Sequence, residues 1–207
     1  MQKKMLFLTF ALGACCALPS VAPAAPEAKG EIVKTLEFTD QNGQNSVVLR
    51  LTGEFARPED RPESDANRAE RSRELFAERF VEKDGQRKQA WRVYDFIHGC
   101  PFQLRLGFFP DLAAVTDLDR DGVSEVWLPY YGACQSDITP PGMKIIMYEG
   151  GQKHAGRGEA HHPEVPDSGR YQADAAFKKA PQSFRRYADE LWQKMLKAES
   201  QLDYNTM

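Results

Sequence analysis

The sequence has few of the residues and none of the short patterns that carry common enzyme chemistry. It contains four cysteines and four histidines among 207 residues. No HExxH, GxSxG, P-loop or GxGxxG pattern is present, which excludes the protease, hydrolase and nucleotide-binding classes that these patterns define. We interpret each histidine as solvated or packed rather than catalytic. The histidines are His98, His154, His161 and His162.

An excess of positive charge is also absent. The net charge is -3, and it becomes -5 when residues 1–24 are left out, because 25 basic residues then face 30 acidic ones. A mildly acidic chain argues against nucleic acid as a partner. Beyond the first 24 residues no segment is apolar enough to cross a membrane, so we expect no transmembrane helix in the mature chain.

The one long apolar run lies at the N-terminus and is typical of export. Lys3 and Lys4 precede an uncharged stretch over residues 5–18, and Ala22-Pro23-Ala24 provides a small-residue cleavage site. This layout predicts a signal peptide over 1–24, a flexible leader over 25–30 and a periplasmic or secreted protein. Residues 12–15 (LGAC) also resemble the lipobox of bacterial lipoproteins, so a lipid anchor on Cys15 is the alternative.

Only two cysteines, Cys100 and Cys134, lie in the body of the chain. An even pair in an exported protein favours one disulfide, and two free buried thiols are the alternative. Their spacing matches neither a CxxC redox motif nor a zinc motif.

Alternating apolar residues and turn residues predict an α+β fold made mainly of antiparallel hairpins, as a partial propeller-like or sandwich sheet. We expect a β-rich domain over 31–160 and a helical segment over 161–207 packed on the sheet. Spacings of three and four from Ala173 to Glu199 predict an amphipathic helix, and Pro181 marks the start of its long part. The expected strand pairs cover 31–38 with 46–52, 75–82 with 88–97, and 144–149 with 153–157.

The stretch TDLDRDGVSEVW, residues 116–127, concentrates negative charge. Counted from Asp117, carboxylates stand at positions one, three, five and nine, and a glycine stands at six. Oxygen ligands at alternate positions around a sharp turn suit a hard cation such as calcium. A plain turn uses one or two such residues and has no need of four acids that repel one another. The predicted ligands are Asp117, Asp119, Asp121, the Val123 carbonyl and Glu125.

This loop departs from an EF-hand. Position twelve is Leu128 instead of an acid, position eight is Ser124 instead of an aliphatic residue, and both flanks are strand-like. The pattern DxDxDGxxE between two strands resembles the calcium loops of FG-GAP and integrin-type propeller repeats. That resemblance implies that the four acids and the carbonyl at position seven hold calcium.

A longer series of segments surrounds the loop. It runs through WRVYDF at 91–96, CP at 100–101, the acidic loop, CQSD at 134–137 and MKIIMYEG at 143–150. The series resembles a poorly characterised family of exported bacterial proteins loosely labelled surface polysaccharide biosynthesis proteins. The resemblance spans about residues 91–158 and implies an envelope-related process without an established reaction.

The sequence therefore predicts an exported, calcium-stabilised binding or accessory protein of the cell envelope, with an envelope polysaccharide or envelope protein as its partner. Trp127, Tyr130 and Tyr131 follow the loop and are candidates for stacking on sugars, while the competing interpretation places alternate members in the core. The alternative function is a carbohydrate-active hydrolase that uses paired carboxylates. Its candidate residues, Asp95 and Asp137, flank the two cysteines.

Overall fold

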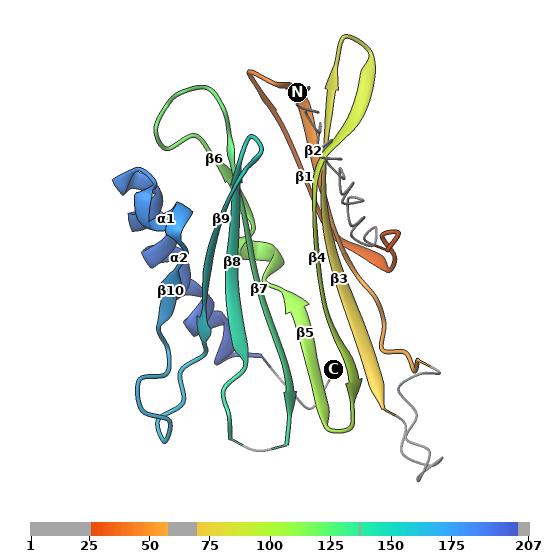
Figure 1. Ribbon diagram of the computed structural model, residues 1–207, viewed down its shortest axis with the longest axis vertical. Helices are drawn as coiled ribbons and strands as arrows, with labels where there is room; N and C mark the ends of the chain where they lie inside the picture. The colour runs from red at the N-terminus through yellow and green to blue at the C-terminus, as the bar shows by residue number, and fades with distance from the viewer. Residues whose placement is uncertain (1–25, 58–69, 137, 203–207) are drawn as a thin grey trace, which may run out of the picture.

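The fold is known from a computed structural model, which describes residues 26–57, 70–136 and 138–202. Two antiparallel sheets face one another, and two helices cover the far side of the second sheet (Figure 1). The first sheet has the strand order β1-β2-β3-β4, and the second has the order β10-β9-β8-β7-β5, with β6 also paired to β7. The predicted α+β class with antiparallel hairpins is confirmed, as a sandwich. The predicted signal peptide and Cys15 lie outside the described residues.

Four hairpin strands make the first sheet, and their turns contain the expected residues. Gly43 has φ 124° and Gly85 has φ 72°, a backbone region that glycine enters without steric cost. The predicted hairpins over 31–52 and 75–97 are therefore present. The strands of both reach closer to their turns than the sequence pattern indicated, and the second hairpin also extends further at its open end. The strands are β1 (Glu31–Asp40), β2 (Gly43–Leu51), β3 (Arg71–Lys83) and β4 (Gln86–Cys100).

The second sheet begins where the chain leaves β4 and crosses the sandwich. The acidic stretch connects β6 to β7, and Gly150-Gly151 connects β8 to β9. The short strand β10 and a 3-10 turn, Pro110–Leu112, are elements that the sequence pattern did not indicate. The strands are β5 (Gln103–Phe108), β6 (Ala114–Thr116), β7 (Glu125–Gln135), β8 (Gly142–Glu149), β9 (Gln152–Glu159) and β10 (Tyr171–Ala173).

Two hydrophobic cores follow from the alternation of side chains along the strands. In β7, Val126, Leu128 and Tyr130 point into the core between the two sheets. The intervening Trp127 and Tyr131 point into a second core, between the second sheet and the helices. Successive residues of a strand face opposite sides of its sheet, so a strand covered on both sides reads as a continuous apolar run.

The helical part has two pieces, α1 (Ala175–Lys179) and α2 (Gln182–Glu199). Asp174 caps α1, since its carboxylate accepts a hydrogen bond from the Phe177 amide at 2.7 Å. Pro181 separates the pieces, as predicted, because proline fits the start of a helix and not its interior. The segment after residue 160 is not wholly helical, however, because β10 extends the sheet before α1 begins.

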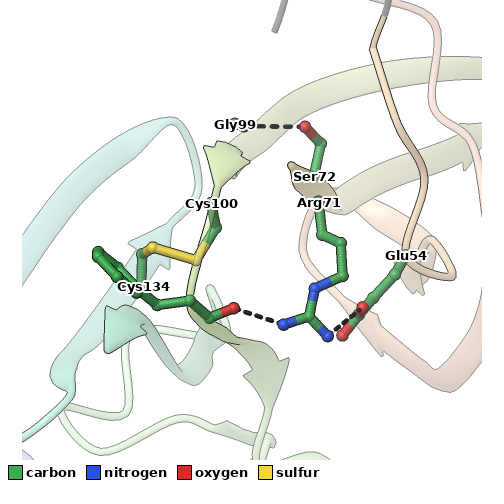
Figure 2. The surroundings of a disulfide bond; sticks show 7 residues. Glu54, Arg71, Ser72, Gly99, Cys100 and Cys134 are labelled. Carbon is green, nitrogen blue, oxygen red and sulfur yellow. Dashed lines mark hydrogen bonds and ion pairs between the residues drawn. A yellow bond between two sulfur atoms is a disulfide. The ribbon is translucent and has the colours of Figure 1, made fainter. Parts of the chain in front are cut away.

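A disulfide links the two sheets at one end. Cys100 ends β4 and Cys134 lies near the end of β7, with Cα atoms 5.6 Å apart (Figure 2). Beside it, Arg71 donates to Glu54 Oε2 at 3.2 Å and to the carbonyl of Phe102. The predicted disulfide is confirmed, and it fixes the corner at which the chain passes from one sheet to the other.

Candidate metal site

The acidic loop forms the tip of the β6–β7 hairpin, at the end of the sandwich opposite the disulfide (Figure 1). Two residues have the left-handed backbone that a tight turn requires: Arg120, with φ 63°, and Gly122, with φ 82°. A Cβ atom on Gly122 would overlap the side chain of Gln41 from the β1–β2 turn. Glycine at position six therefore serves both the local turn and the close approach of the other sheet.

Five carboxylates gather at this tip in two overlapping groups. In each group the carboxylate oxygens lie within 4.8 Å of one another, and Asp119 belongs to both. The three loop aspartates are exposed, Glu125 is buried and Glu149 is half-buried. Such groups could hold a metal ion. The groups are Asp117, Asp119 and Glu125, and Asp119, Asp121 and Glu149.

The sequence missed Glu149. It ends β8 and pairs directly with Glu125 of β7, so the sheet register brings it to the loop from 24 residues further along the chain. The four carboxylates predicted as ligands are all at the site, although no group of three contains all of Asp117, Asp121 and Glu125. The Val123 carbonyl stays a prediction, and the amide of Val123 donates to Asp121 Oδ1 at 2.7 Å.

Glu125 is the fixed, buried member of the set. Glu125 is 0% exposed. The Thr116 hydroxyl donates a hydrogen bond to its Oε2, and the Leu118 amide donates one to its Oε1 at 3.0 Å. The Trp127 indole N–H donates to the Thr116 oxygen at 2.8 Å, so the hydroxyl connects the core to the site. Burial raises the pKa of Glu125, the nearby aspartates Asp119 and Asp117 raise it further, and these hydrogen bonds lower it in part.

The electrostatics of Glu149 reveal how crowded the negative charge is. Burial raises its pKa to about 7, together with the charges of Asp119, Asp121 and Glu125. A carboxyl group with this pKa is half protonated at neutral pH when no cation is present. A bound cation would favour the ionised forms of all these groups and so relieve their mutual repulsion.

A buried ion pair positions the loop against the first sheet. Arg79 of β3 and Asp40 at the end of β1 meet at 3.0 Å, and each side chain is 1% exposed. Asp40 also accepts from the amides of Ser124 at 3.2 Å and Asn42 at 2.8 Å. Arg79 donates to the Gly150 carbonyl at 3.4 Å in the β8–β9 turn. One arginine and one aspartate thus connect three turns from the two sheets.

The Asp40 carboxyl stays ionised in this network. Burial alone would raise its pKa, but hydrogen bonds from Asn42, Ser124 and Asn45, together with the charge of Arg79, outweigh burial and lower it. Gln41 reinforces the contact, since its amide donates to the Gly122 carbonyl at 2.9 Å and its side chain donates to the Asp121 carbonyl. The acidic loop is therefore held by backbone and ionic contacts that leave its aspartate side chains exposed.

The three aromatic residues considered for sugar stacking are all buried. Trp127 is 0% exposed, Tyr130 is 4% and Tyr131 is 5%. Trp127 lies against Tyr187 and Phe177 in the helical core, so its ring faces are covered by protein. The structure therefore corrects the stacking interpretation. The competing interpretation placed only alternate members of the three in a core. In the structure both alternating sets are buried, each in a different core.

Asp95, a candidate acid for hydrolysis, is also held in place. Its Oδ2 accepts from the Tyr130 hydroxyl at 2.9 Å and from the Lys144 ammonium. Burial raises its pKa, but Lys144 and these hydrogen bonds outweigh burial, so the pKa is lowered overall. A general acid for glycoside hydrolysis needs the opposite shift. Its proposed partner, Asp137, lies outside the described residues.

Within the residues described here, none of the helices has both the length and the hydrophobicity to cross a membrane. Comparison of the chain with protein-family models, with curated proteins and with solved structures finds no match.

Proposed function

We propose that the chain is an exported binding or accessory protein of the cell envelope whose sandwich is stabilised by calcium at the 117–125 loop. The observation that carries this proposal is the convergence of five carboxylates on one exposed tip, with Asp119 shared by both groups. Oxygen-only ligands, several of them carboxylates, suit calcium better than zinc or copper, which prefer nitrogen or sulfur.

A stabilising role fits the position of the site. The loop contacts the end of β1 through Asp40 and the β1–β2 turn through Gln41, and Glu149 at the end of β8 lies beside it. A cation bound there would bridge carboxylates of the β6–β7 loop and of β8, close to the place where the second sheet contacts the first sheet. The disulfide supports export, because disulfides persist in oxidising compartments.

The cation is tested by thermal unfolding of the purified chain in calcium, in magnesium and in chelator. A ligand at 100 times its dissociation constant stabilises by about 2.7 kcal/mol, which shifts the melting temperature of a domain this size by about 5–10 °C. Asp119→Asn should greatly weaken the response to calcium, because it removes the negative charge of the carboxylate that both groups share. Asp111→Asn, an exposed aspartate outside the loop, is the matched control. Identical melting of the wild type in calcium and in chelator would refute the site.

Export is tested by expressing the full chain in a bacterium and measuring the mass of the product recovered outside the cytoplasm. Cleavage after residue 24 gives a soluble product that begins near residue 25. Processing at Cys15 gives a heavier, lipid-modified product in the membrane fraction. An unprocessed chain confined to the cytoplasm would contradict the envelope role.

A further inference from the structure

A histidine lies buried beneath the helical layer, which α1 and α2 form on the second sheet. His154 of β9 is 5% exposed, and its ring meets the rings of Phe177 in α1 and Phe184 in α2 edge-on, with centroids 5.7 Å and 6.3 Å away. Both ring nitrogens are shielded from solvent, and in the described part of the chain neither makes a hydrogen bond of normal geometry. The neutral ring suits this apolar site, whereas an imidazolium would bring a charge and a second N–H donor that nothing there accepts.

The groups that the helices and β10 place around the ring do not compensate for such a charge. Burial lowers the pKa of His154, and the Ala176 backbone and the charge of Asp174, which precedes α1, offset burial only in part. Tyr171 of β10 and Tyr187 of α2 contribute hydroxyl groups whose pKa is raised by burial, so they stay neutral in acid. The charged side chains of α1 and of the first turns of α2 are exposed to solvent, and they are Lys178, Lys179, Arg185, Arg186, Asp189 and Glu190.

The neighbouring strands place no charge directly beside the ring. Met147 of β8 pairs with His154, and Trp127 of β7 pairs with Met147, so the three residues lie in one row of the sheet. Glu149 and Glu125 lie one row further along, at the candidate metal site. Burial raises the pKa of both acids, so each favours the folded chain as the pH falls. Their effect on stability is therefore opposite in sign to that of the histidine.

We propose that protonation of His154 releases the helical layer from the second sheet while the sandwich stays folded. The connection next to the ring depends on one carboxylate, because Asp174 accepts from the Ala155 amide at 3.0 Å and from the Phe177 amide at 2.7 Å. The Asp174 amide also donates to the Ala155 carbonyl at 2.8 Å. These bonds join β9 to the start of α1 one residue from His154, so water that enters to solvate a charged ring also reaches them. The release goes beyond the proposed function and uses none of the metal ligands.

The sandwich depends on groups that His154 does not contact. Its core lies on the other face of the second sheet, and the disulfide and the buried ion pair of Arg79 connect its two sheets. The last turn of α2 has a separate attachment, because Glu199 forms an ion pair with Arg105 of β5 at 3.0 Å. We therefore expect α1 and the start of α2 to open first, with the two sheets still in place.

The size of the effect follows from proton linkage. In the open layer His154 has the ordinary pKa of about 6.5, whereas in the closed layer its pKa is lower. The open layer therefore binds the proton more tightly, so the closed layer has its full stability above about pH 6.5 and loses stability as the pH falls. One proton raises the equilibrium constant for opening by at most about tenfold per pH unit, which is at most about 30-fold from pH 7.5 to pH 5.0.

Hydrogen exchange of the purified chain at pH 7.5 and 5.0, read by mass spectrometry and corrected for the intrinsic pH dependence of exchange, measures this opening. In the wild type, protection of α1 and of the start of α2 should fall by up to about 30-fold at pH 5.0, while protection of β2 and β3 should not change. His154→Phe keeps an aromatic ring that cannot become charged, so its helices should be equally protected at both pH values. His161→Gln is the matched control, because His161 is exposed and this variant should respond like the wild type.

A wild type whose helices are equally protected at both pH values would overturn the proposal, and so would a loss of protection that extends equally to β2 and β3. A His154→Phe variant that responds like the wild type would overturn it as well. If that variant does not fold, NMR titration of the His154 ring in the wild type decides, since a ring that becomes charged while α1 stays protected contradicts the release. All of these measurements are made in chelator, so failure of the calcium response would refute the metal site and leave this result unaffected.

Discussion

The two ends of the sandwich join the same two sheets by different means. At one end the link is covalent, through Cys100 and Cys134. At the other end it is ionic and passes through Arg79 and Asp40 to the acidic loop. In Figure 1 the β8–β9 turn and the β6–β7 loop lie at the top, and β4 and β7 end at the bottom.

This difference indicates which solution conditions should affect each end. The covalent end needs only an oxidising compartment, and the ion pair beside it, between Arg71 and Glu54, is partly exposed and so contributes little to stability. The ionic end combines a fully buried ion pair with five carboxylates. These carboxylates repel one another, because both of their groups consist of acidic side chains only. We therefore expect the ionic end to respond to calcium and pH, and the covalent end to respond to reductant.

The largest effect should come from removing the arginine that connects the three turns. Arg79→Met leaves the Asp40 carboxylate buried without its cation, and breaking a buried pair in this way costs about 3–5 kcal/mol. The free energy of unfolding from urea denaturation measures the loss. Arg186→Met, at an exposed position of α2, should change stability by less than about 0.5 kcal/mol. A similar small change for Arg79→Met would indicate that the ion pair contributes little to this end.

The covalent end should cost somewhat less to break. Replacing both cysteines by serine removes a constraint across 34 residues of sequence, for which about 2–4 kcal/mol of stability is typical. The same urea experiment, with and without reductant, gives the value, and the double serine variant should be insensitive to reductant. If the calcium response of the melting temperature disappears together with the disulfide, the two ends are not independent.

Much of the fold could be predicted from the sequence because its signals are local. Asn-Gly and Asp-Gly turns between alternating segments fixed the hairpins, and Pro181 fixed the start of α2. Burial of both faces of β7 was not predictable in the same way. The alternation at Trp127 and Tyr130 shows only that the two residues point to opposite sides, and the helical layer that covers one of those sides comes from 50 residues later.

The site was predictable where its residues are contiguous and was missed where they are not. Asp117 to Glu125 lie within nine residues, whereas Glu149 arrives through the β7–β8 register and Arg79 and Asp40 come from the other sheet. A signal for Glu149 existed, since pairing residues 125–132 with 142–149 as an antiparallel hairpin places it opposite Glu125. A buried ion pair such as Arg79 and Asp40 has no local signature, because each member alone resembles a surface charge.

The smallest expected effect is the pH dependence of stability at the ionic end. It must be separated from the contribution of His154, which lies in the core beneath the helices. Burial lowers the pKa of His154, so its protonation destabilises the folded chain as the pH falls below about 6.5. His154 contributes equally to the wild type and to Glu149→Gln, since it lies against Phe177 and Phe184, in the core beneath the helices. The difference between these two proteins therefore removes the His154 contribution and leaves that of Glu149 and the carboxylates coupled to it.

Glu149 has a pKa of about 7 in the folded chain, above the ordinary glutamate value of 4.5. An acid whose pKa rises on folding binds its proton more tightly in the folded state, so the chain in chelator loses stability as the pH rises from 4.5 to 7. Glu149→Gln removes this loss. In chelator the variant should be more stable than the wild type at pH 8, and the gap should close toward pH 4.5.

In saturating calcium the order at pH 8 should reverse. The wild type then binds calcium with a charged carboxylate at position 149, whereas the variant has only a neutral amide there. Urea unfolding at these pH values measures both differences, and a wild type that is more stable than the variant at pH 8 in chelator would show that the carboxylates do not repel one another as their positions imply.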